Sequence, residues 1–140
     1  MYSSQTSNNG IMGYLDTYDF EGEYITWTTD GANAGTVFYR NGKFNCTNVC
    51  GVLLSNTVPA SRMIAESINN VAKNHVSYVG NPKLMNNVMA EIEIKISSEP
   101  KEREKISDFL NTLDKLIFLH QCKLEKLKPV KQSMLHNMFV

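Results

Sequence analysis

The sequence predicts an α+β protein, with a small mixed lobe of short antiparallel strands and one or two helices, followed by a long C-terminal coiled-coil helix. Aromatic and β-branched runs separated by Gly, Asn and Asp continue to about residue 54, as expected for strands and turns. Apolar residues at helical spacing follow Pro59, and a heptad pattern follows Pro100. The predicted division is a lobe over 1–99 and a helix with its tail over 100–140.

Three candidate strands fill the first part of the lobe. They are Tyr24–Thr28, Thr36–Tyr39 and Val49–Leu54. Asn41-Gly42 lies between two apolar stretches, and both central positions of a type I′ turn need positive φ. The dipeptide therefore predicts a tight hairpin turn.

The rest of the lobe alternates between helical and extended patterns. Pro59-Ala60-Ser61 predicts a helix start, and the spacing of the apolar residues carries that helix to about His75. Gly80-Asn81-Pro82 predicts a turn, and a short helical piece follows it. Glu91–Ile96 alternates charged and apolar residues, which is typical of a strand with one buried face.

Beyond Pro100 the apolar residues follow steps of four and three, which define the seam of a coiled coil. Residues 101–128 would form a rod of about 42 Å. Pro129 removes a helical hydrogen bond, so the sequence predicts a kink or break there. His120 is predicted to be a polar residue that sets the register of the pairing. The predicted helix-pairing residues are Ile106, Leu110, Leu113, Ile117, His120, Leu124 and Leu127, and the pattern continues through Lys131, Met134 and Met138.

Composition is that of an ordinary globular protein, with 42% hydrophobic and 20% charged residues and a net charge of zero. Residues 1–55 carry two basic against five acidic side chains, a net charge of −3, whereas residues 101–140 carry eight against five, a net charge of +3. No apolar run is long enough for a membrane span, and the N-terminus lacks the order of a secretory signal, so a cytoplasmic location without membrane contact is expected. The three cysteines, Cys46, Cys50 and Cys122, are expected to be reduced packing residues rather than disulfide or zinc ligands.

Candidate binding residues are short polar side chains in the lobe. The stretch Trp27–Gly35 could be a structural loop, a loop that lies against DNA, or a phosphate cradle, although it lacks the Walker lysine and the Rossmann glycine spacing. The polar run 3–10 could be a disordered tail or a DNA-facing segment, because Gln and Asn can pair with adenine. The candidate DNA contacts are Gln5, Asn8, Asn9, Thr28, Thr29, Asn33, Arg40 and Lys43.

The sequence offers few candidate residues for catalysis. His75, His120 and His136 have no nucleophile in a recognisable context. The carboxylates of residues 16–23 lack calcium-loop spacing, so no metal site is expected. The sequence therefore favours a chain without a catalytic centre.

Two stretches resemble the specificity subunits of type I restriction-modification systems. The first resembles the later half of a target-recognition domain, and the second resembles the spacer helix that follows it. The first stretch includes Ser3-Ser4-Gln5-Thr6, Asn8-Asn9-Gly10, Gly13-Tyr14, Asp19-Phe20, Gly22-Glu23, the loop Trp27–Gly35 and Gly42-Lys43-Phe44 through Cys50-Gly51. The second includes Pro100, Glu104, Lys105-Ile106, Phe109-Leu110, Leu113-Asp114 and Ile117, continuing to Leu127-Lys128, Lys131 and Met138-Phe139.

The resemblance implies a non-catalytic subunit that recognises a DNA sequence. Expected partners are double-stranded DNA, modification (methyltransferase) subunits, a restriction subunit and a second specificity-subunit chain or fragment. The chain itself would hold no cofactor, and S-adenosylmethionine and ATP would bind the partner subunits. The resemblance begins partway through a recognition domain, which implies a partial domain over 1–99. The alternatives are a protein-interaction module acting through the heptad helix, a nonfunctional fragment, or an enzyme fragment that uses the Trp27–Gly35 loop.

Overall fold

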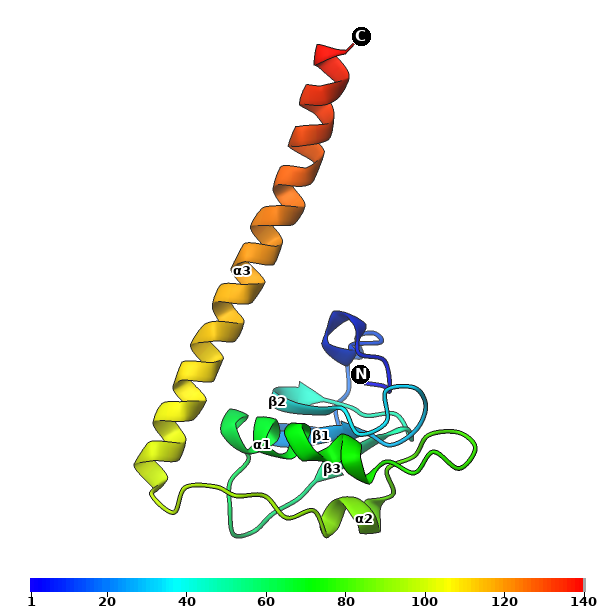
Figure 1. The fold of residues 1–140 in the computed structure, drawn as a ribbon, viewed down its shortest axis with the longest axis vertical. Coiled ribbons are helices and arrows are strands. Elements are labelled where there is room, and N and C mark those ends of the chain that lie inside the picture. Colours follow the sequence, from blue (N-terminus) through cyan, green and yellow to red (C-terminus); the bar gives the residue numbers. More distant parts are fainter. Residues whose placement is uncertain (140) are drawn as a thin grey trace.

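The computed structural model describes residues 1–139 and consists of a compact lobe from which one long helix extends (Figure 1). This is the α+β architecture that the sequence predicts. Residue 140, which the predicted C-terminal tail includes, lies outside the described residues. The elements in chain order are the 3-10 turn η1 (Ser7–Gly10), strands β1 (Phe20–Thr28), β2 (Val37–Phe44) and β3 (Cys50–Leu53), helix α1 (Arg62–Ala72), the 3-10 turn η2 (Lys73–His75), and helices α2 (Asn86–Ala90) and α3 (Pro100–Met138).

The three strands form an antiparallel sheet in the order β2-β1-β3. β1 is the central strand: Trp27 is paired with Val37 on one side and with Gly51 on the other. An added Cβ at Gly51 would lie only 2.4 Å from Cζ2 of the Trp27 ring. The indole can therefore cross over β3 only because position 51 has no side chain.

Both faces of the sheet are covered. Alternate residues of β1, including Ile25 and Trp27, belong to the apolar core shared with α1. Thr26 and Thr28 point to the opposite face and are also buried. On that face Tyr2 of the N-terminal segment contacts the ring of Phe44 edge-on, with 5.6 Å between the ring centroids.

Helix α1 begins where the sequence predicts. Ser61 has extended backbone, and its Oγ accepts a hydrogen bond from the Ile64 N–H at 3.3 Å, so it caps the helix. Met63, Ile64 and Ile68 are buried in the core. The Asn69 side chain adds a polar link, because its Oδ1 accepts the Val37 N–H at 2.9 Å.

The prediction of a hairpin turn at Asn41-Gly42 is wrong. β2 continues through both residues, with Asn41 opposite Glu23 and Gly42 opposite Gly22. Gly22 and Gly42 both have positive φ, 119° and 103°, so the glycine pair accommodates a local distortion inside the ladder instead of reversing the chain. The chain reverses earlier, over residues 29–36, where the Gly35 N–H donates to Thr28 O.

The prediction of a strand over Glu91–Ile96 is also wrong. The apolar side chains expected on the buried face of that strand do pack against the core. This segment has no strand assignment and no ladder partner among residues 1–139. Ile92, Ile94 and Ile96 are half-buried and pack against the core, while the charged residues between them are exposed. Alternation here reflects an extended chain lying on the core, which needs no neighbouring strand to bury every second side chain.

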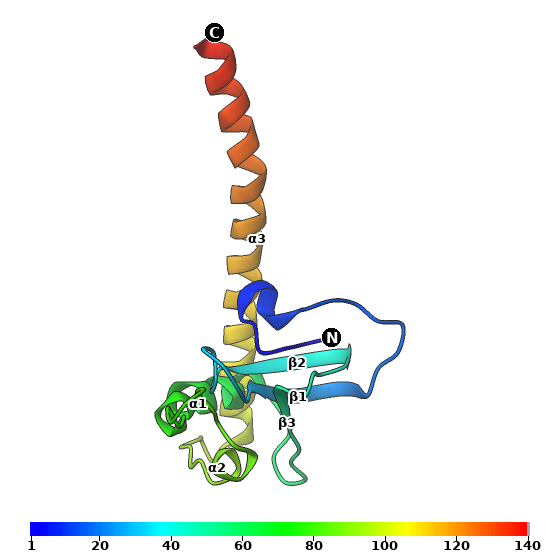
Figure 2. The ribbon, with the colours of Figure 1, turned by 90° about the vertical axis from the view of Figure 1, so that its right-hand side faces the viewer.

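Helix α3 begins at Pro100, where a missing N–H costs little, and continues to Met138. It passes through Pro129 without a break, so the predicted interruption is wrong. Figure 1 shows a smooth course past that point, and Figure 2 shows the helix standing clear of the lobe over most of its length. The residues around Pro129 are exposed, so the costs of the proline, a lost hydrogen bond and the crowding of its ring against the carbonyl of Glu125, fall on the helix backbone alone. Among the described residues, no helix combines the length and apolarity that a membrane span requires.

Candidate nucleic-acid interface

The N-terminal polar run is a folded loop that is hydrogen-bonded to the turn between β2 and β3. The Tyr2 N–H donates to Asn45 O at 2.8 Å, and the Thr47 N–H donates to Tyr2 O at 2.9 Å. The loop closes on itself through the Ser3 N–H, which donates to Gly10 O at 3.1 Å. Of the two interpretations of residues 3–10, the structure therefore favours an ordered segment over a disordered tail.

Asn8 and Asn9 form the tip of this loop. Both have left-handed backbone, with φ of 50° and 54°, and both are exposed. Asn tolerates this conformation better than most residues. Gly10 follows with φ of 78°, and a Cβ there would lie 3.0 Å from Nη2 of Arg40. The tip is therefore built directly on the Arg40 side chain.

Arg40 lies at the centre of this arrangement and is only 2% exposed. Its guanidinium lies 3.6 Å from the ring centroid of Tyr2 and 4.3 Å from that of Phe38. Its Nη1 donates to Asn9 O at 2.7 Å, and its Nε donates to Thr26 Oγ1 at 3.2 Å. Burial lowers the pKa of Arg40 below its usual value. With its donors directed inward, Arg40 holds the loop tip and is not presented to a DNA phosphate, contrary to the expected contact.

Gln5 and Asn33 link the N-terminal loop to the loop between β1 and β2. The Asn33 Nδ2 donates to Ser4 O at 3.2 Å, and the Gln5 Nε2 donates to Ile11 O at 2.5 Å. Both residues are half-buried. The structure therefore brings Gln5, Asn8, Asn9 and Asn33 together at one corner of the lobe, with the amides of Gln5 and Asn33 already engaged.

The other candidate threonines differ in exposure. Thr28 is 1% exposed, so its side chain is in the interior and not on the surface where a DNA contact was expected. Thr29 is half-buried, and its Oγ1 donates to Asp30 Oδ2 at 2.8 Å. This hydrogen bond and the ion pair with Lys83, at 3.1 Å, lower the pKa of Asp30. Thr29 thus supports a charged pair at the rim of the loop.

Lys43 lies near the opposite end of β2 from this corner. Its side chain is exposed, with Nζ 3.7 Å from Glu21 Oε1 and 4.5 Å from the ring centroid of Tyr18. An exposed ion pair of this length holds the lysine only weakly. Lys43 therefore remains available to an anionic partner.

The loop from Trp27 to Gly35 does not have the donors of a phosphate cradle. The N–H groups of Gly31, Ala34 and Gly35 donate to Pro82 O, Gly31 O and Thr28 O, each at 2.9 Å. A phosphate-binding loop needs such groups free and converging on one point. In residues 1–139 no cluster of three or more metal-ligating side chains is found either.

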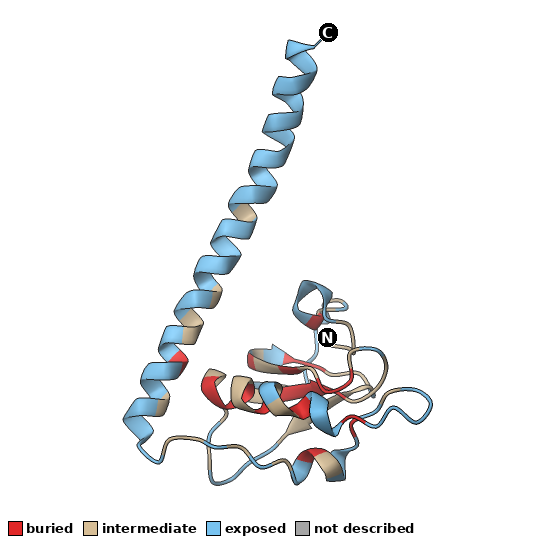
Figure 3. Ribbon diagram, viewed as in Figure 1, coloured by how far each residue is buried: buried red, intermediate tan, exposed pale blue. Residues whose placement is uncertain are grey.

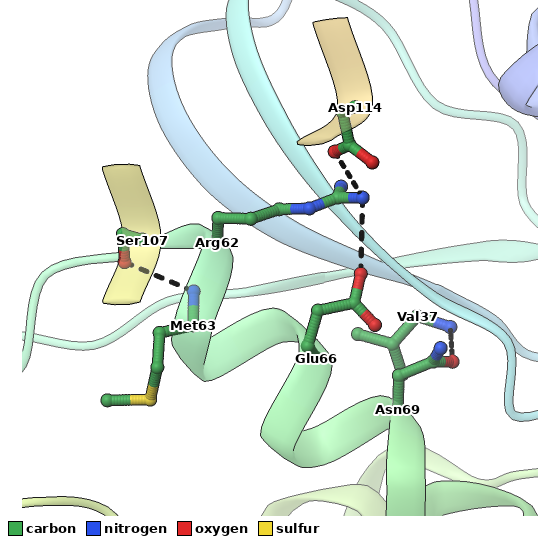
Figure 4. Close-up of polar contacts among 7 residues, drawn as sticks. All are labelled: Val37, Arg62, Met63, Glu66, Asn69, Ser107 and Asp114. Atoms are coloured by element: carbon green, nitrogen blue, oxygen red, sulfur yellow. Dashed lines mark hydrogen bonds and ion pairs between the residues drawn. The ribbon is translucent and has the colours of Figure 1, made fainter. Parts of the chain in front are cut away.

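The base of α3 is joined to α1 by polar contacts that the sequence did not reveal (Figure 4). Ser107, which is buried, accepts the Met63 N–H on its Oγ at 3.2 Å. Arg62 bridges Asp114 at 2.5 Å and Glu66 at 3.2 Å. Within the heptad pattern these residues are unremarkable polar positions, so only the fold identifies them.

Most of the apolar seam of α3 is not covered by the lobe, and Figure 3 shows the helix exposed over most of its length. Leu110 is half-buried against the core, whereas Leu113, Ile117 and Leu124 are 39%, 55% and 54% exposed. His120 is exposed on the same side. A shallow groove along the helix is lined by Leu113, Leu116, Ile117, His120, Gln121 and Leu124. The described chain thus carries an apolar helix face that the lobe does not cover.

Comparison with known proteins places the chain in a family. Residues 1–129 match the sequence model described as the type I restriction modification DNA specificity domain. A putative type I specificity subunit N-terminus from Mycoplasma pneumoniae is 48% identical over 114 residues, covering 80% of this chain and 60% of that protein. A putative type I specificity subunit of the same organism is 43% identical over 135 residues, covering 94% of this chain and 36% of that protein.

The specificity subunit of the type I restriction enzyme MpnII, also from Mycoplasma pneumoniae, is 45% identical over 119 residues, covering 83% of this chain and 35% of that protein. The matched part of the chain therefore spans 60%, 36% and 35% of the lengths of these three relatives, less than two thirds in each case. The match to the family model nevertheless runs from the folded N-terminal loop through the lobe and most of α3. The chain belongs to the type I restriction modification DNA specificity domain family.

Proposed function

We propose that this chain takes part in sequence-specific DNA recognition within a type I restriction-modification methyltransferase complex, as part of its specificity subunit. The observation that carries the proposal is the family match over 129 of 140 residues, which includes both the polar corner of the lobe and most of the helix. The relative that is named as the specificity subunit of a type I restriction enzyme supports it.

Within the lobe, we assign base contacts to the loop tip and phosphate contact to Lys43. Asn8 and Asn9 are exposed and carry amides that can pair with a base edge. Gln5, Thr29 and Asn33 already make internal hydrogen bonds and would shape the surface or join the contact after small rearrangements. Thr28 and Arg40, which are buried, would support the loop from below.

The loop tip is tested by replacing Asn8 or Asn9 with Gly. Glycine keeps the left-handed backbone of these positions without strain and removes only the amide. In a complex with the modification subunits, the variant that loses a base contact should bind its specific site more weakly by about 1–3 kcal/mol, with little effect on unrelated DNA. Equal affinity of both variants and the parent would place base recognition elsewhere.

Lys43→Gln is the matched variant for phosphate contact. This variant should weaken binding to all DNA sequences alike. It should also reduce the slope of log binding constant against log salt concentration by about one. Sequence-dependent loss in this variant would contradict the assigned role.

The isolated chain is expected to bind duplex DNA only weakly. Residues 1–55 have a net charge of −3, which opposes attraction to phosphates, so we expect a dissociation constant in the nonspecific range of about 10⁻⁴ to 10⁻⁶ M. Adding the modification subunits and a complementary recognition fragment should raise affinity through additional contacts and effective concentration. Fluorescence anisotropy at two salt concentrations measures both. Nanomolar, sequence-selective binding by the chain alone would contradict the proposal that specific binding requires the partner subunits.

The seam of α3 is assigned to pairing with another helix, from a second specificity-subunit chain or fragment. Burying the exposed parts of Leu113 and Leu124, 39% and 54% of each residue, would contribute about 2 kcal/mol per chain. Replacing both with Asp should therefore weaken a two-chain contact by about 4 kcal/mol, or roughly a thousandfold. Thr112→Asp with Ser133→Asp is the control, because it adds the same charge at exposed positions outside the seam. Sedimentation velocity that shows equal association for both double variants would refute the pairing role.

The chain would act without a catalytic centre of its own. Methyl transfer from S-adenosylmethionine would belong to the modification subunits, and ATP-dependent cleavage to the restriction subunit, in the cytoplasm. We expect methylation of a target duplex only when the modification subunit is added. Methyl transfer by the purified chain alone would contradict this proposal.

A protein-interaction module acting through α3 alone is the second candidate, and the acidic first part of the lobe favours it. The variants described above distinguish this interaction module from a chain that recognises DNA. Unchanged DNA affinity in the loop-tip and Lys43 variants, together with loss of partner binding in the seam variant, would select the interaction module. No gain in affinity from any partner would indicate a nonfunctional fragment.

A further inference from the structure

Two of the three cysteines lie together where the turn after β2 leads into β3: Cys46 is in the turn and Cys50 is the first residue of β3. The Sγ atoms of Cys46 and Cys50 are 3.0 Å apart, and both residues are half-buried. The turn is closed by the Cys50 N–H, which donates to Thr47 O at 3.0 Å. Cys122 lies far along α3 and has no part in this pair.

The surroundings make the two thiols chemically different. The pKa of Cys50 is lowered, first by its hydrogen bond with Cys46 and also by the Arg40 guanidinium and the Thr26 hydroxyl. The pKa of Cys46 is raised, first by the hydrogen bond with Cys50 and also by partial burial. Arginine keeps its charge at all physiological pH values. Cys50 is therefore the better nucleophile of the two. The Cys46 sulfur lies close enough to attack the sulfenic acid that forms on Cys50.

We propose that Cys46 and Cys50 form a peroxide-reactive dithiol that closes to a reversible intrachain disulfide, with Cys50 attacking and Cys46 resolving. This site is separate from the DNA-recognition role proposed above and does not depend on it. A disulfide sulfur–sulfur bond is about 2.05 Å long, so the two sulfurs need to approach by roughly 1 Å. Rotation of two side chains in a short turn can supply a movement of that size.

The reaction balances with a hydroperoxide as the oxidant. The Cys50 thiolate attacks one oxygen of hydrogen peroxide, the O–O bond breaks, and hydroxide leaves and takes up the proton that Cys50 had released, giving water. The Cys50 sulfenic acid is then attacked by the Cys46 sulfur, the S–O bond breaks, and the Cys46 proton leaves with the hydroxyl group as a second water. Two electrons pass from the sulfurs to the peroxide, and a thiol reductant reverses the bond.

The position of the pair connects it to the recognition corner of the lobe. The turn that it would clamp accepts the Tyr2 N–H at Asn45 O and donates the Thr47 N–H to Tyr2 O. Tyr2 in turn stacks on Arg40, which holds the loop tip.

The test compares oxidation of the full chain in its native state and in concentrated urea. After treatment with equimolar hydrogen peroxide, free thiols are alkylated and the chain is digested with trypsin. Cleavage after Lys43 and Arg62 places Cys46 and Cys50 in one peptide, and Cys122 falls in another. We expect the first peptide to lose two hydrogens and take no alkyl group, while Cys122 is alkylated. The native reaction should be faster than oxidation of Cys122 on the order of ten-fold, should lose that advantage in urea, and should reverse with dithiothreitol.

Serine variants assign the two roles. In Cys46→Ser, a sulfenic acid should accumulate on Cys50 and be trapped by dimedone, whereas in Cys50→Ser, Cys46 should oxidise no faster than Cys122. Cys122→Ser is the matched control and should form the disulfide at the parental rate. Absence of the disulfide in the native parent, equal oxidation of Cys122, or an unchanged rate in urea would overturn the proposal. Exchanged behaviour of the two serine variants would overturn the assignment of attacking and resolving cysteines.

Discussion

Replacing Ser107 with Ala should destabilise the lobe although the residue belongs to α3. The first N–H groups of a helix have no acceptor within it. In α1 the Ser61 Oγ accepts from Ile64, and the Ser107 Oγ accepts from Met63 at 3.2 Å. Because Ser107 is only 8% exposed, water cannot readily replace its hydroxyl. The variant leaves a buried N–H without a partner, which costs about 1–2 kcal/mol.

Urea unfolding measures this loss, since the single tryptophan, Trp27, lies in the core and its fluorescence reports directly on the lobe. With a denaturant dependence of about 1.5 kcal/mol/M, the midpoint should fall by roughly 1 M. Ser133→Ala on the exposed part of α3 is the matched control and should leave the midpoint unchanged. An unchanged midpoint in Ser107→Ala, with a clear loss in Ser61→Ala, would refute the idea that α3 caps α1.

Three further predictions concern the sheet and the long helix. Gly51→Ala should destabilise the lobe by about 1–3 kcal/mol, because the new methyl group would lie 2.4 Å from the buried Trp27 ring, and urea unfolding measures it. Burial and the hydrogen bond to Glu23 raise the pKa of Tyr39 to about 12, so the stability that its protonated form contributes is complete below about pH 10 and is lost as pH rises through about 12. Ultraviolet absorbance of phenolate should show one late titration, which Glu23→Gln moves to lower pH. Pro129→Ala should increase helicity in circular dichroism without shifting the urea midpoint of the lobe, because Pro129 lies far from it.

Each of these three has a direct control. Gly13→Ala adds a methyl group where nothing lies within 4 Å and should cost little. Tyr14→Phe removes a phenol that is 86% exposed and should leave the late titration in place. Gln132→Ala near Pro129 should raise helicity only slightly, since neither residue type disrupts a helix. Equal responses of variant and control would contradict the corresponding prediction.

Local patterns predicted the order of elements because each depends on neighbouring residues. Ser61 identified the start of α1, and the heptad residues identified α3, since capping and helical periodicity operate within a few residues. Asn41-Gly42 was misassigned because positive φ also suits a glycine pair inside a ladder, and the choice depends on Gly22 across the sheet. Such a partner is distant in sequence and has no local signature.

The candidate site was predicted in outline but not in detail. The exposed amides of Asn8 and Asn9 could be recognised from composition, because polar side chains in a loop usually reach the surface. The interior position of Arg40 could not, since arginine is rarely buried and its partners, Asn9 and Tyr2, lie 31 and 38 residues earlier in the chain. The closeness of Cys46 and Cys50 likewise depends on the turn that the sheet imposes.

Two contacts near the base of α3 join it to α1, so a small shift at one of them produces a larger displacement at the far end of the helix. Ser107 and Asp114 are two turns apart, or about 10.5 Å along the axis, and roughly 36 Å of helix extends beyond Asp114 to Met138. With Asp114 as the pivot, a shift of about 0.5 Å at the Ser107 contact would therefore move the far end of the helix by roughly 1.7 Å. This is half of the 3.4 Å rise per base in one DNA strand. If α3 pairs with another helix as proposed, the accuracy with which it presents its apolar seam depends on a serine and an ion pair at its base.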